Sequence, residues 1–405
     1  MSALNVGVIR EDKLPVDART PLTPDQIAFL KEQYPNINVK VQSSSVRCFG
    51  DEEYKKLRID VVEDLSDCDV LFGVKEVPID LLLPEKAYFF FSHTIKKQPS
   101  NQRLLKSILD KKITLIDYET LTNENGLRII AFGRWAGIVG AYNALWTFGK
   151  KYNLFNLKRA HECKDYEELV NELKKVDLPP VKIVLTGNGR VAKGALEILN
   201  KIELKRVEPI PFIFQIFDQP VYTQIDVDVY THRKDGEKFN FEHFFAHPDM
   251  YAGNFWPFAK KADILISAAF WDPRSPRLFE LEQVKDPAFN IRTIADITCD
   301  IDGSIPTTRK ATTIQEPVFD VDIKSLKELP AFSDKDNLSE MAVDNLPSEL
   351  PRDASFDFGK QLIENVLPSL FGQAPEDVLE RATIAKSGHL TERYAYLESY
   401  ASGKE

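Results

Sequence analysis

The chain has 405 residues, which at about 150 residues per domain is enough for two or three domains with cores of their own. Hydrophobic residues make up 43% and charged residues 28%, a globular balance that excludes disorder along most of the chain. The net charge of −10 would repel a phosphate backbone. We therefore expect no nucleic-acid partner.

The cysteines and the apolar runs indicate the cell compartment in which we expect the protein. The amino terminus lacks the basic and apolar pattern of a signal peptide, and no uncharged apolar run reaches about 18 residues. We expect a cytoplasmic protein with no membrane partner, and a homo-oligomer stays open. The four cysteines form no CxxC pair, which predicts free, mostly buried thiols in a reducing compartment and no metal site: Cys48, Cys68, Cys163 and Cys299.

The first 120 residues alternate short apolar runs with polar helical segments. This pattern predicts parallel strands covered by helices. The segment 23–33 predicts a helix, because Thr23 can cap it, Pro24 takes the first helical position and Gln26 completes a capping box. The predicted strands are 5–10, 38–42, 69–77, 88–93 and 114–119.

A second α/β pattern begins after a helical stretch at 136–152 and a polar segment at 158–178. A strand at 181–186 leads through a glycine turn into a helix with apolar residues on one face, namely Val191, Ala195, Ile198 and Ile202. Further strands are predicted at 221–227, 263–269 and 292–298.

The tail after about residue 310 is too short for a third α/β unit. It has a polar, proline-dotted segment at 322–352 and an amphipathic helix at 356–371. We therefore predict an α/β fold of two Rossmann-like domains with parallel sheets, in which the tail completes the first domain. The predicted domains are 1–136 plus 318–405 for substrate and catalysis, and 137–317 for the nucleotide.

The glycine turn carries a GxGxxA match between a strand and a helix. Glycines there permit a tight turn and let a pyrophosphate approach the positive helix end. A dinucleotide site is the favoured interpretation, against an ordinary strand-to-helix turn or an S-adenosylmethionine loop. The residues of the turn are Gly187, Asn188, Gly189, Arg190 and Val191.

A carboxylate at the end of the second strand usually binds the adenosine ribose. Asp226 is our candidate, although an insertion at about 203–220 separates it from the glycines, and Asp228 or a solvated loop residue is an alternative. A carboxylate at this position would repel a 2′-phosphate, which favours NAD and leaves NADP open. The predicted cofactor set also includes residues at later strand ends, namely Ser267, Ala268 and Asp296.

Charged residues follow the predicted strands of the first domain, at the edge where open parallel sheets bind ligands. Any one of them could be an ordinary surface residue, but together they favour a site: Arg10, Lys75, Glu76, His93 and Glu119. Lysine and histidine suit proton transfer during amine–carbonyl redox chemistry. Arginine offers a fork for a substrate carboxylate, with Arg10, Arg19 and Arg128 as candidates.

Several blocks of this sequence are similar to a known family. The order and spacing of the blocks resemble the alanine dehydrogenase/transhydrogenase amino-terminal domain, and more narrowly the lysine-forming saccharopine dehydrogenases and the lysine–ketoglutarate reductases. The carboxyl-terminal insertion at about 325–342 has no counterpart. The blocks are DARTPLTP (17–24), GVKEVP (73–78), FSHTIKKQ (91–98), LIDYETL (115–121), AFGRWAGIVGAYNAL (131–145), FWDPRSPRLF (270–279), DITCDIDGSI (296–305) and VDNLPSELPRDAS (343–355).

The resemblance implies a role for each matching residue. Lys75 and His93 would move protons, Glu76 would modulate the pKa of the lysine, and Asp300 would lie near the nicotinamide, with Asp296 as the structural member of that pair. The implied reaction interconverts saccharopine with lysine and 2-oxoglutarate. An alanine dehydrogenase and a catalytically silent nucleotide sensor are the alternatives. The implied substrate-binding residues are Arg10, Lys13, Arg19, Lys96, Glu119 and Arg128.

Overall fold

The computed structural model describes residues 4–375 and 377–404. The chain forms two compact units, one of residues up to Phe132 together with those from Pro351 onward, the other of Gly133–Leu350. Residues 318–350 therefore lie in the second unit, whereas the sequence pattern assigned them to the first. The reason is strand pairing, because β16 (Leu338–Met341) pairs with β13 (Thr293–Asp296) of the second sheet.

The first unit is built on an eight-stranded sheet in the order β18-β17-β6-β5-β4-β1-β2-β3. Six strands are parallel, as expected, while the carboxyl-terminal β17 and β18 add an antiparallel edge. The strands are β1 (Leu4–Val8), β2 (Ile37–Gln42), β3 (Asp60–Val62), β4 (Val70–Phe72), β5 (Ala87–Phe90), β6 (Thr114–Asp117), β17 (Thr383–Lys386) and β18 (His389–Leu390).

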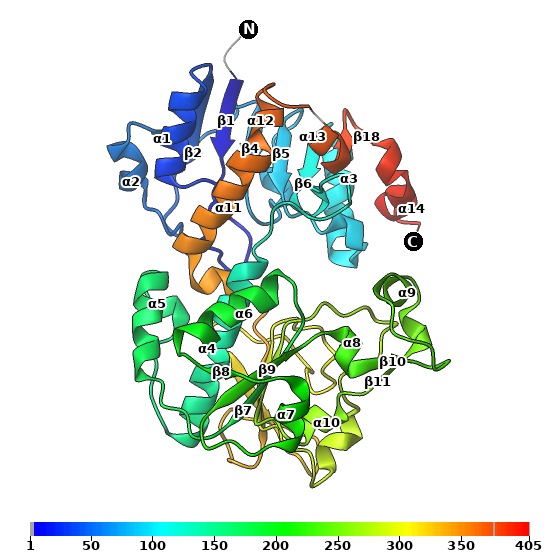
Figure 1. The fold of residues 1–405 in the computed structure, drawn as a ribbon. Coiled ribbons are helices and arrows are strands. Elements are labelled where there is room, and N and C mark those ends of the chain that lie inside the picture. Colours follow the sequence, from blue (N-terminus) through cyan, green and yellow to red (C-terminus); the bar gives the residue numbers. More distant parts are fainter. Residues whose placement is uncertain (1–3, 376, 405) are drawn as a thin grey trace. The chain divides into compact units, whose positions relative to one another are not determined.

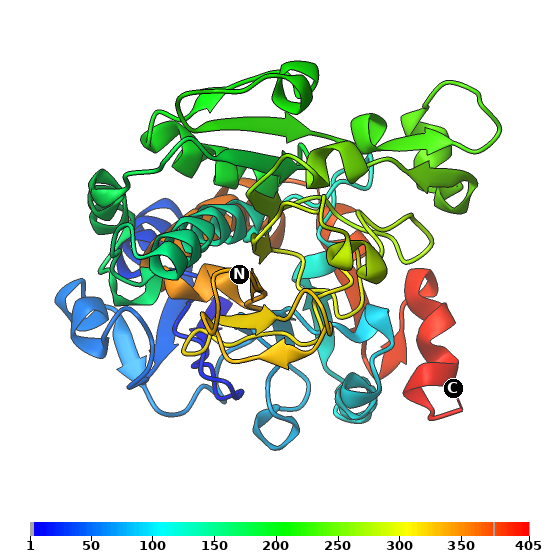
Figure 2. The same ribbon diagram turned by 90° about the horizontal axis from the view of Figure 1, so that it is seen from below.

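Helices cover both faces of this sheet (Figure 1). On one face, Ile27 of α1 and Phe358 of α11 pack against Val6 and Val8, and on the other Leu105 of α3 packs with the chain end. Figure 2 shows the red carboxyl-terminal segment at the edge of this unit, where α14 contacts α3. The helices are α1 (Pro24–Gln33), α2 (Asp51–Lys56), α3 (Gln102–Asp110), α11 (Pro351–Asn365), α12 (Leu367–Leu370), α13 (Asp377–Ala382) and α14 (Glu398–Ala401).

The second unit has a sheet in the order β15-β14-β16-β13-β12-β7-β9-β8. Six strands are again parallel, and the β14–β15 hairpin is the antiparallel edge that the sequence pattern did not predict. The remaining strands are β7 (Lys182–Thr186), β8 (Lys205–Arg206), β9 (Val221–Ile225), β12 (Ile264–Ser267), β14 (Val318–Val321) and β15 (Glu328–Leu329), with a separate hairpin of β10 (Thr231–Arg233) and β11 (Tyr251–Gly253).

Helix α4 (Gly133–Tyr152) packs tightly against α6 (Arg190–Lys201). A Cβ atom on Gly137 would lie 1.8 Å from the carbonyl oxygen of Val191, and one on Gly194 would lie 2.0 Å from that of Arg134. Only glycine permits this backbone approach. The other helices of the unit are α5 (Tyr166–Glu172), α7 (Pro209–Phe214), α8 (Val227–Tyr230), α9 (Phe241–Ala246) and α10 (Trp256–Ala259).

Three sequence predictions concern the described residues as a whole. No helix within 4–375 or 377–404 is long and apolar enough to cross a membrane. The same residues contain no cluster of three or more His, Cys, Asp or Glu side chains that could hold a metal ion. All four cysteines are free, and two of them, Cys68 and Cys163, are buried, while Cys48 and Cys299 are half-buried.

Candidate active site at the strand ends of the first unit

The carboxyl ends of β1, β4 and β5 bring three predicted site residues together. Glu76, four residues after β4, is buried, and its Oε1 lies 2.7 Å from Nδ1 of His93 beyond β5. Its Oε2 accepts a 2.5 Å hydrogen bond from Nζ of Lys13, which follows β1. Burial alone would raise the pKa of the Glu76 carboxyl, but the contacts with His93 and Lys13 outweigh it and hold that pKa at about 2. Glu76 is therefore an anion that contacts both the imidazole of His93 and the ammonium group of Lys13.

The backbone of His93 takes an uncommon conformation. Its φ is +53°, in the left-handed region that non-glycine residues rarely adopt, at the start of the short 3₁₀ helix Thr94–Lys96. Buried Asp117 at the end of β6 holds the preceding residue, since it accepts hydrogen bonds from the amide (3.0 Å) and the hydroxyl of Ser92. Burial raises the pKa of Asp117 to about 6. Asp117 thus fixes the turn that presents the imidazole.

Lys75 lies between Val74 and Glu76 and is half-buried. Desolvation lowers the pKa of its ammonium group, and the nearby positive charge of Arg19 lowers it further. A lysine with a depressed pKa can accept and donate a proton nearer to neutrality than a solvated one. This environment suits the acid–base role that the sequence predicted for Lys75.

Glu11 is a site residue that the sequence reasoning missed. Its carboxylate accepts hydrogen bonds from the amides of Val74 (2.6 Å) and Lys75 (2.8 Å), so it ties the end of β1 to the loop after β4. Burial raises the pKa of Glu11 to about 7. Its position three residues after β1, beside Arg10, was the signal that could have identified it.

Arg19 is buried and forms a bidentate pair with Asp17, at 2.9 Å through Nε and 2.6 Å through Nη2. Its guanidinium also lies 4.2 Å from the centre of the Phe132 ring. The two hydrogen bonds and the ring hold the arginine in one orientation. Arg19 is therefore a preorganised cation close to Lys75.

Glu119 forms ion pairs with two other predicted substrate-binding residues, Lys96 and Arg128. It is buried after β6, and its Oε1 pairs with Nζ of Lys96 at 3.1 Å and with Nη2 of Arg128 at 3.3 Å. Among the described residues its second oxygen, Oε2, is buried without a hydrogen-bond partner. Buried acceptors normally have donors, so this oxygen is suited to a donor on a bound molecule.

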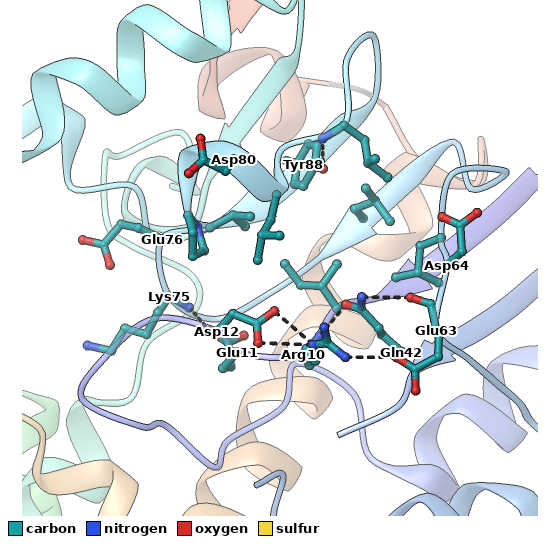
Figure 3. Close-up of a pocket in the computed structure, with 17 residues that line it drawn as sticks. Arg10, Glu11, Asp12, Gln42, Glu63, Asp64, Lys75, Glu76, Asp80 and Tyr88 are labelled. Carbon is teal, nitrogen blue, oxygen red and sulfur yellow. Dashed lines mark hydrogen bonds and ion pairs between the residues drawn. The ribbon is translucent and has the colours of Figure 1, made fainter. Parts of the chain in front are cut away.

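Arg10 has two carboxylate partners in the first unit. Its guanidinium pairs with Asp12 at 3.0 Å and with Glu63 at 3.1 Å, and Figure 3 shows it between these two carboxylates. It lines a cavity of about 240 Å³ that Lys75 and Glu76 also line. Arg10 and Arg19 therefore both already have carboxylate partners, Asp12 and Glu63 for Arg10 and Asp17 for Arg19.

Candidate nucleotide site of the second unit

The glycine turn joins β7 to α6 as the sequence predicted. Gly187 has a φ of +92°, and its amide donates to the carbonyl of Ile225 at 2.8 Å. A Cβ atom there would meet the backbone of Ala269 at 2.9 Å. Gly189 caps α6 with ordinary backbone angles, and a Cβ atom on it would meet nothing within 4 Å. The space beside Gly189 at the start of α6 is therefore open, as a phosphate-binding turn requires.

The other predicted nucleotide residues lie at neighbouring strand ends. Asp226 directly follows β9, which pairs with β7, and is half-buried, whereas Asp228 is exposed. Ser267 ends β12, and the amide of Ala268 donates to Thr186 Oγ1 at 3.2 Å. Because all three strands are parallel, these residues share one edge with the glycine turn.

Asp296 and Asp300 differ in environment. Asp296 is buried at the end of β13 and accepts hydrogen bonds of 2.6 Å from the hydroxyls of Thr298 and Thr308. Asp300 is exposed in the following loop. These contacts support the structural role expected for Asp296. Asp300 belongs to the second unit, and Lys75, Glu76 and His93 belong to the first.

The amino-terminal part of the sequence matches a known family model, and the whole fold is similar to two solved structures. Residues 7–139 match the family model described as the alanine dehydrogenase/PNT amino-terminal domain. The fold is similar to that of L-alanine dehydrogenase, with a TM-score of 0.65 and 16% identity over 99% of this chain and 100% of the other. A transhydrogenase from Sinorhizobium meliloti gives a TM-score of 0.61 and 14% identity over 96% of this chain and 98% of the other.

Two groups of curated relatives match nearly the whole chain. An alpha-aminoadipic semialdehyde synthase of Arabidopsis thaliana is 30% identical over 97% of this chain and 41% of its own length. A saccharopine dehydrogenase [NAD(+), L-lysine-forming] of Emericella nidulans is 25% identical over 89% of this chain and 90% of its own. The resemblance expected from the sequence is confirmed. The chain spans less than half the length of the synthases.

Proposed function

We propose that this chain catalyses the pyridine-nucleotide-dependent interconversion of saccharopine with L-lysine and 2-oxoglutarate. The single observation that carries the proposal is the Lys13–Glu76–His93 cluster beside Lys75. It places an anion, an imidazole and a lysine of lowered pKa at one strand edge. The relatives support the same activity, because saccharopine dehydrogenases are similar over 90% of their own length.

In the reductive direction the lysine amine attacks the keto carbon of 2-oxoglutarate, water leaves, and the imine accepts a hydride. NADH supplies that hydride when it is bound. His93 is suited to protonate the departing oxygen, because the Glu76 anion 2.7 Å away holds its imidazole in place. Lys75 is suited to take the proton from the attacking amine, because desolvation has lowered its pKa.

The substrate carboxylates need cationic anchors. Arg19 is held rigidly by Asp17, and Lys96 and Arg128 converge on Glu119. Saccharopine carries three carboxylates and alanine one, and the first unit offers more cations than a monocarboxylate requires. The unpartnered Oε2 of Glu119 is suited to a substrate ammonium or amine group.

The cofactor residues follow from the open space beside Gly189 at the start of α6. Gly187, Asn188 and Gly189 would let the pyrophosphate approach the amides of Arg190 and Val191, and the carboxylate of Asp226 would bind the adenosine ribose. A carboxylate there disfavours a 2′-phosphate, so we propose NAD as the preferred cofactor. Asp300, in the exposed loop after β13, is our candidate for the nicotinamide side.

We also propose that the protein is cytoplasmic and that it forms a homo-oligomer. A synthase of Bos taurus that covers 98% of this chain carries "mitochondrial" in its name. Fractionation of the producing cells would decide the compartment, and light scattering after size-exclusion chromatography would give the mass of the assembly relative to the 46.2 kDa chain.

A panel of amino acids and keto acids with NADH and NADPH, followed at the nicotinamide absorbance, tests the proposed function. We expect oxidation of NADH only when lysine and 2-oxoglutarate are both present. Ammonia with pyruvate as the preferred pair would replace the proposal by alanine dehydrogenase. Nucleotide binding without turnover on any pair would favour a nucleotide sensor.

A further inference from the structure

Two buried carboxyl groups share one hydroxyl group in the second unit. Glu340 lies in the middle of β16, between Ile294 of β13 and Phe319 of β14, and neither it nor Asp296 is exposed to solvent. Thr308 is also fully buried. Its Oγ lies 2.6 Å from Oδ2 of Asp296 and contacts Oε1 of Glu340 at hydrogen-bond distance.

The number of protons decides the charge of this group. A threonine hydroxyl carries one proton and can donate it to one carboxylate only. With both carboxyl groups ionised, the second contact would place a hydroxyl lone pair against a carboxylate lone pair. The contact is favourable only if that second carboxyl group is protonated and donates to Thr308.

We infer that the Asp296–Thr308–Glu340 group holds one proton at neutral pH and that Glu340 acts as a neutral carboxylic acid. Glu340 is then a positioning residue for the segment 296–308, because Thr308 closes that segment onto both β13 and β16. A backbone hydrogen bond also holds this segment closed, since the amide of Asp302 donates to the carbonyl of Thr308 at 2.9 Å. The segment contains Asp300, so the positioning role rests on the proposed function. The presence of the shared proton is independent of that function.

The surrounding groups agree with this assignment. Burial raises the pKa of Glu340 to about 8, and the nearby Asp296 raises it as well. The hydroxyls of Thr307 and Thr308 and the charge of Arg309 act in the opposite direction but are weaker. On the other side of the group, burial raises the pKa of Asp296, and Asp300 adds to that effect. Cys299, whose pKa is also raised by burial, stays a neutral thiol.

Stability against pH tests the proton directly. The folded chain binds a proton that the unfolded chain releases above the ordinary glutamate value of 4.5, so the native state loses stability as the pH rises toward about 8. One such proton changes the folding equilibrium constant about tenfold per pH unit. Glu340→Gln places an amide donor where the acid proton was. We expect this variant to gain stability relative to the wild type by about 50-fold between pH 6 and pH 8, measured by urea unfolding.

The matched control is Asp320→Asn on the neighbouring β14. Asp320 is equally buried, but it accepts hydrogen bonds from the amide and hydroxyl of Ser333 and from the hydroxyl of Ser339. Asp320 also stabilises the charged form of buried Lys151, whose pKa desolvation lowers to about 8, so the control carries Lys151→Met as well. This double variant should lose stability but keep the slope of the wild type between pH 6 and pH 8. A second variant, Asp296→Asn, should also reduce the slope, because the remaining carboxylate of Glu340 then accepts the Thr308 proton.

The outcomes separate this inference from the proposed function, since unfolding needs no substrate. Parallel curves for the wild type and Glu340→Gln between pH 6 and pH 8 would overturn the shared proton. Failure of Glu340→Gln to fold at pH 6 would do so too, because the amide should fit there. A reduced slope with unchanged NADH affinity and turnover would keep the proton and overturn the positioning of the 296–308 segment.

Discussion

At the scale of single residues, the site joins groups that lie far apart in the sequence. Glu76 links Lys13 to His93, although 63 and 17 positions separate them from it. The rule that polar residues gather at the ends of parallel strands predicted Lys75, Glu76, His93 and Glu119. It could not predict which of them pair, because pairing depends on loop paths such as the left-handed turn at His93.

Lys75→Met and His93→Gln should each lower turnover by about 10²- to 10⁴-fold, the usual contribution of a positioned acid or base. The affinity for NADH should change little, because the glycine turn belongs to the other unit. Steady-state kinetics and nucleotide titration check both statements. Lys106→Met is the control, since Lys106 is exposed and forms an ion pair with Asp110 on the same helix. Wild-type turnover in both variants would remove the acid–base assignment.

Arg19→Ala should reduce both stability and saccharopine binding. The change leaves Asp17 buried without its partner, which costs about 3–5 kcal/mol of unfolding free energy. It should also raise the Michaelis constant for saccharopine, if the arginine binds a carboxylate. Denaturant unfolding and kinetics separate the two effects. The double variant Asp17→Ala/Arg19→Ala should recover part of the stability and none of the substrate affinity, and recovery of both would show that Arg19 is purely structural.

At the scale of helices and strands, local sequence signals predicted an element correctly where its backbone and side chains favour the same structure. The capping box of α1 is present, with Thr23 accepting from the amide of Gln26 and Gln26 accepting from that of Thr23. Strand β16 escaped prediction because its LSEM sequence has two polar residues, yet all four residues are buried. Ser339 and Oε1 of Glu340 have tertiary hydrogen-bond partners that no local pattern shows.

Gly194→Ala should destabilise the packing of α4 on α6. The new Cβ atom would lie 2.0 Å from the carbonyl oxygen of Arg134, and helix backbones cannot yield as a flexible side chain can. We expect a loss of about 1–3 kcal/mol or more in unfolding free energy, measured by denaturant titration. Gly189→Ala is the control, because its Cβ atom would face open space and should change stability by less than about 0.5 kcal/mol. Equal stability of the two variants would contradict the observed approach.

At the scale of the whole molecule, the sequence predicts that the carboxyl-terminal segment returns to the first unit. It does not predict the residue at which the chain crosses between the units. The amphipathic helix at 356–371 corresponds to α11 and α12, whose Phe358, Leu362 and Leu367 join the core of the first unit. The crossing falls at Pro351 and not near 318, because the polar segment 322–352 contributes β15 and β16 to the other sheet. Composition alone marks such a segment as loop.

The oxidation of saccharopine by NAD⁺ is the most direct test of the central claim. We predict that purified chain reduces NAD⁺ with saccharopine and releases lysine and 2-oxoglutarate in equal amounts. Alanine should support far slower reduction, because one carboxylate cannot engage both Arg19 and the Lys96–Glu119–Arg128 group. Robust oxidation of alanine with no detectable oxidation of saccharopine would contradict the account.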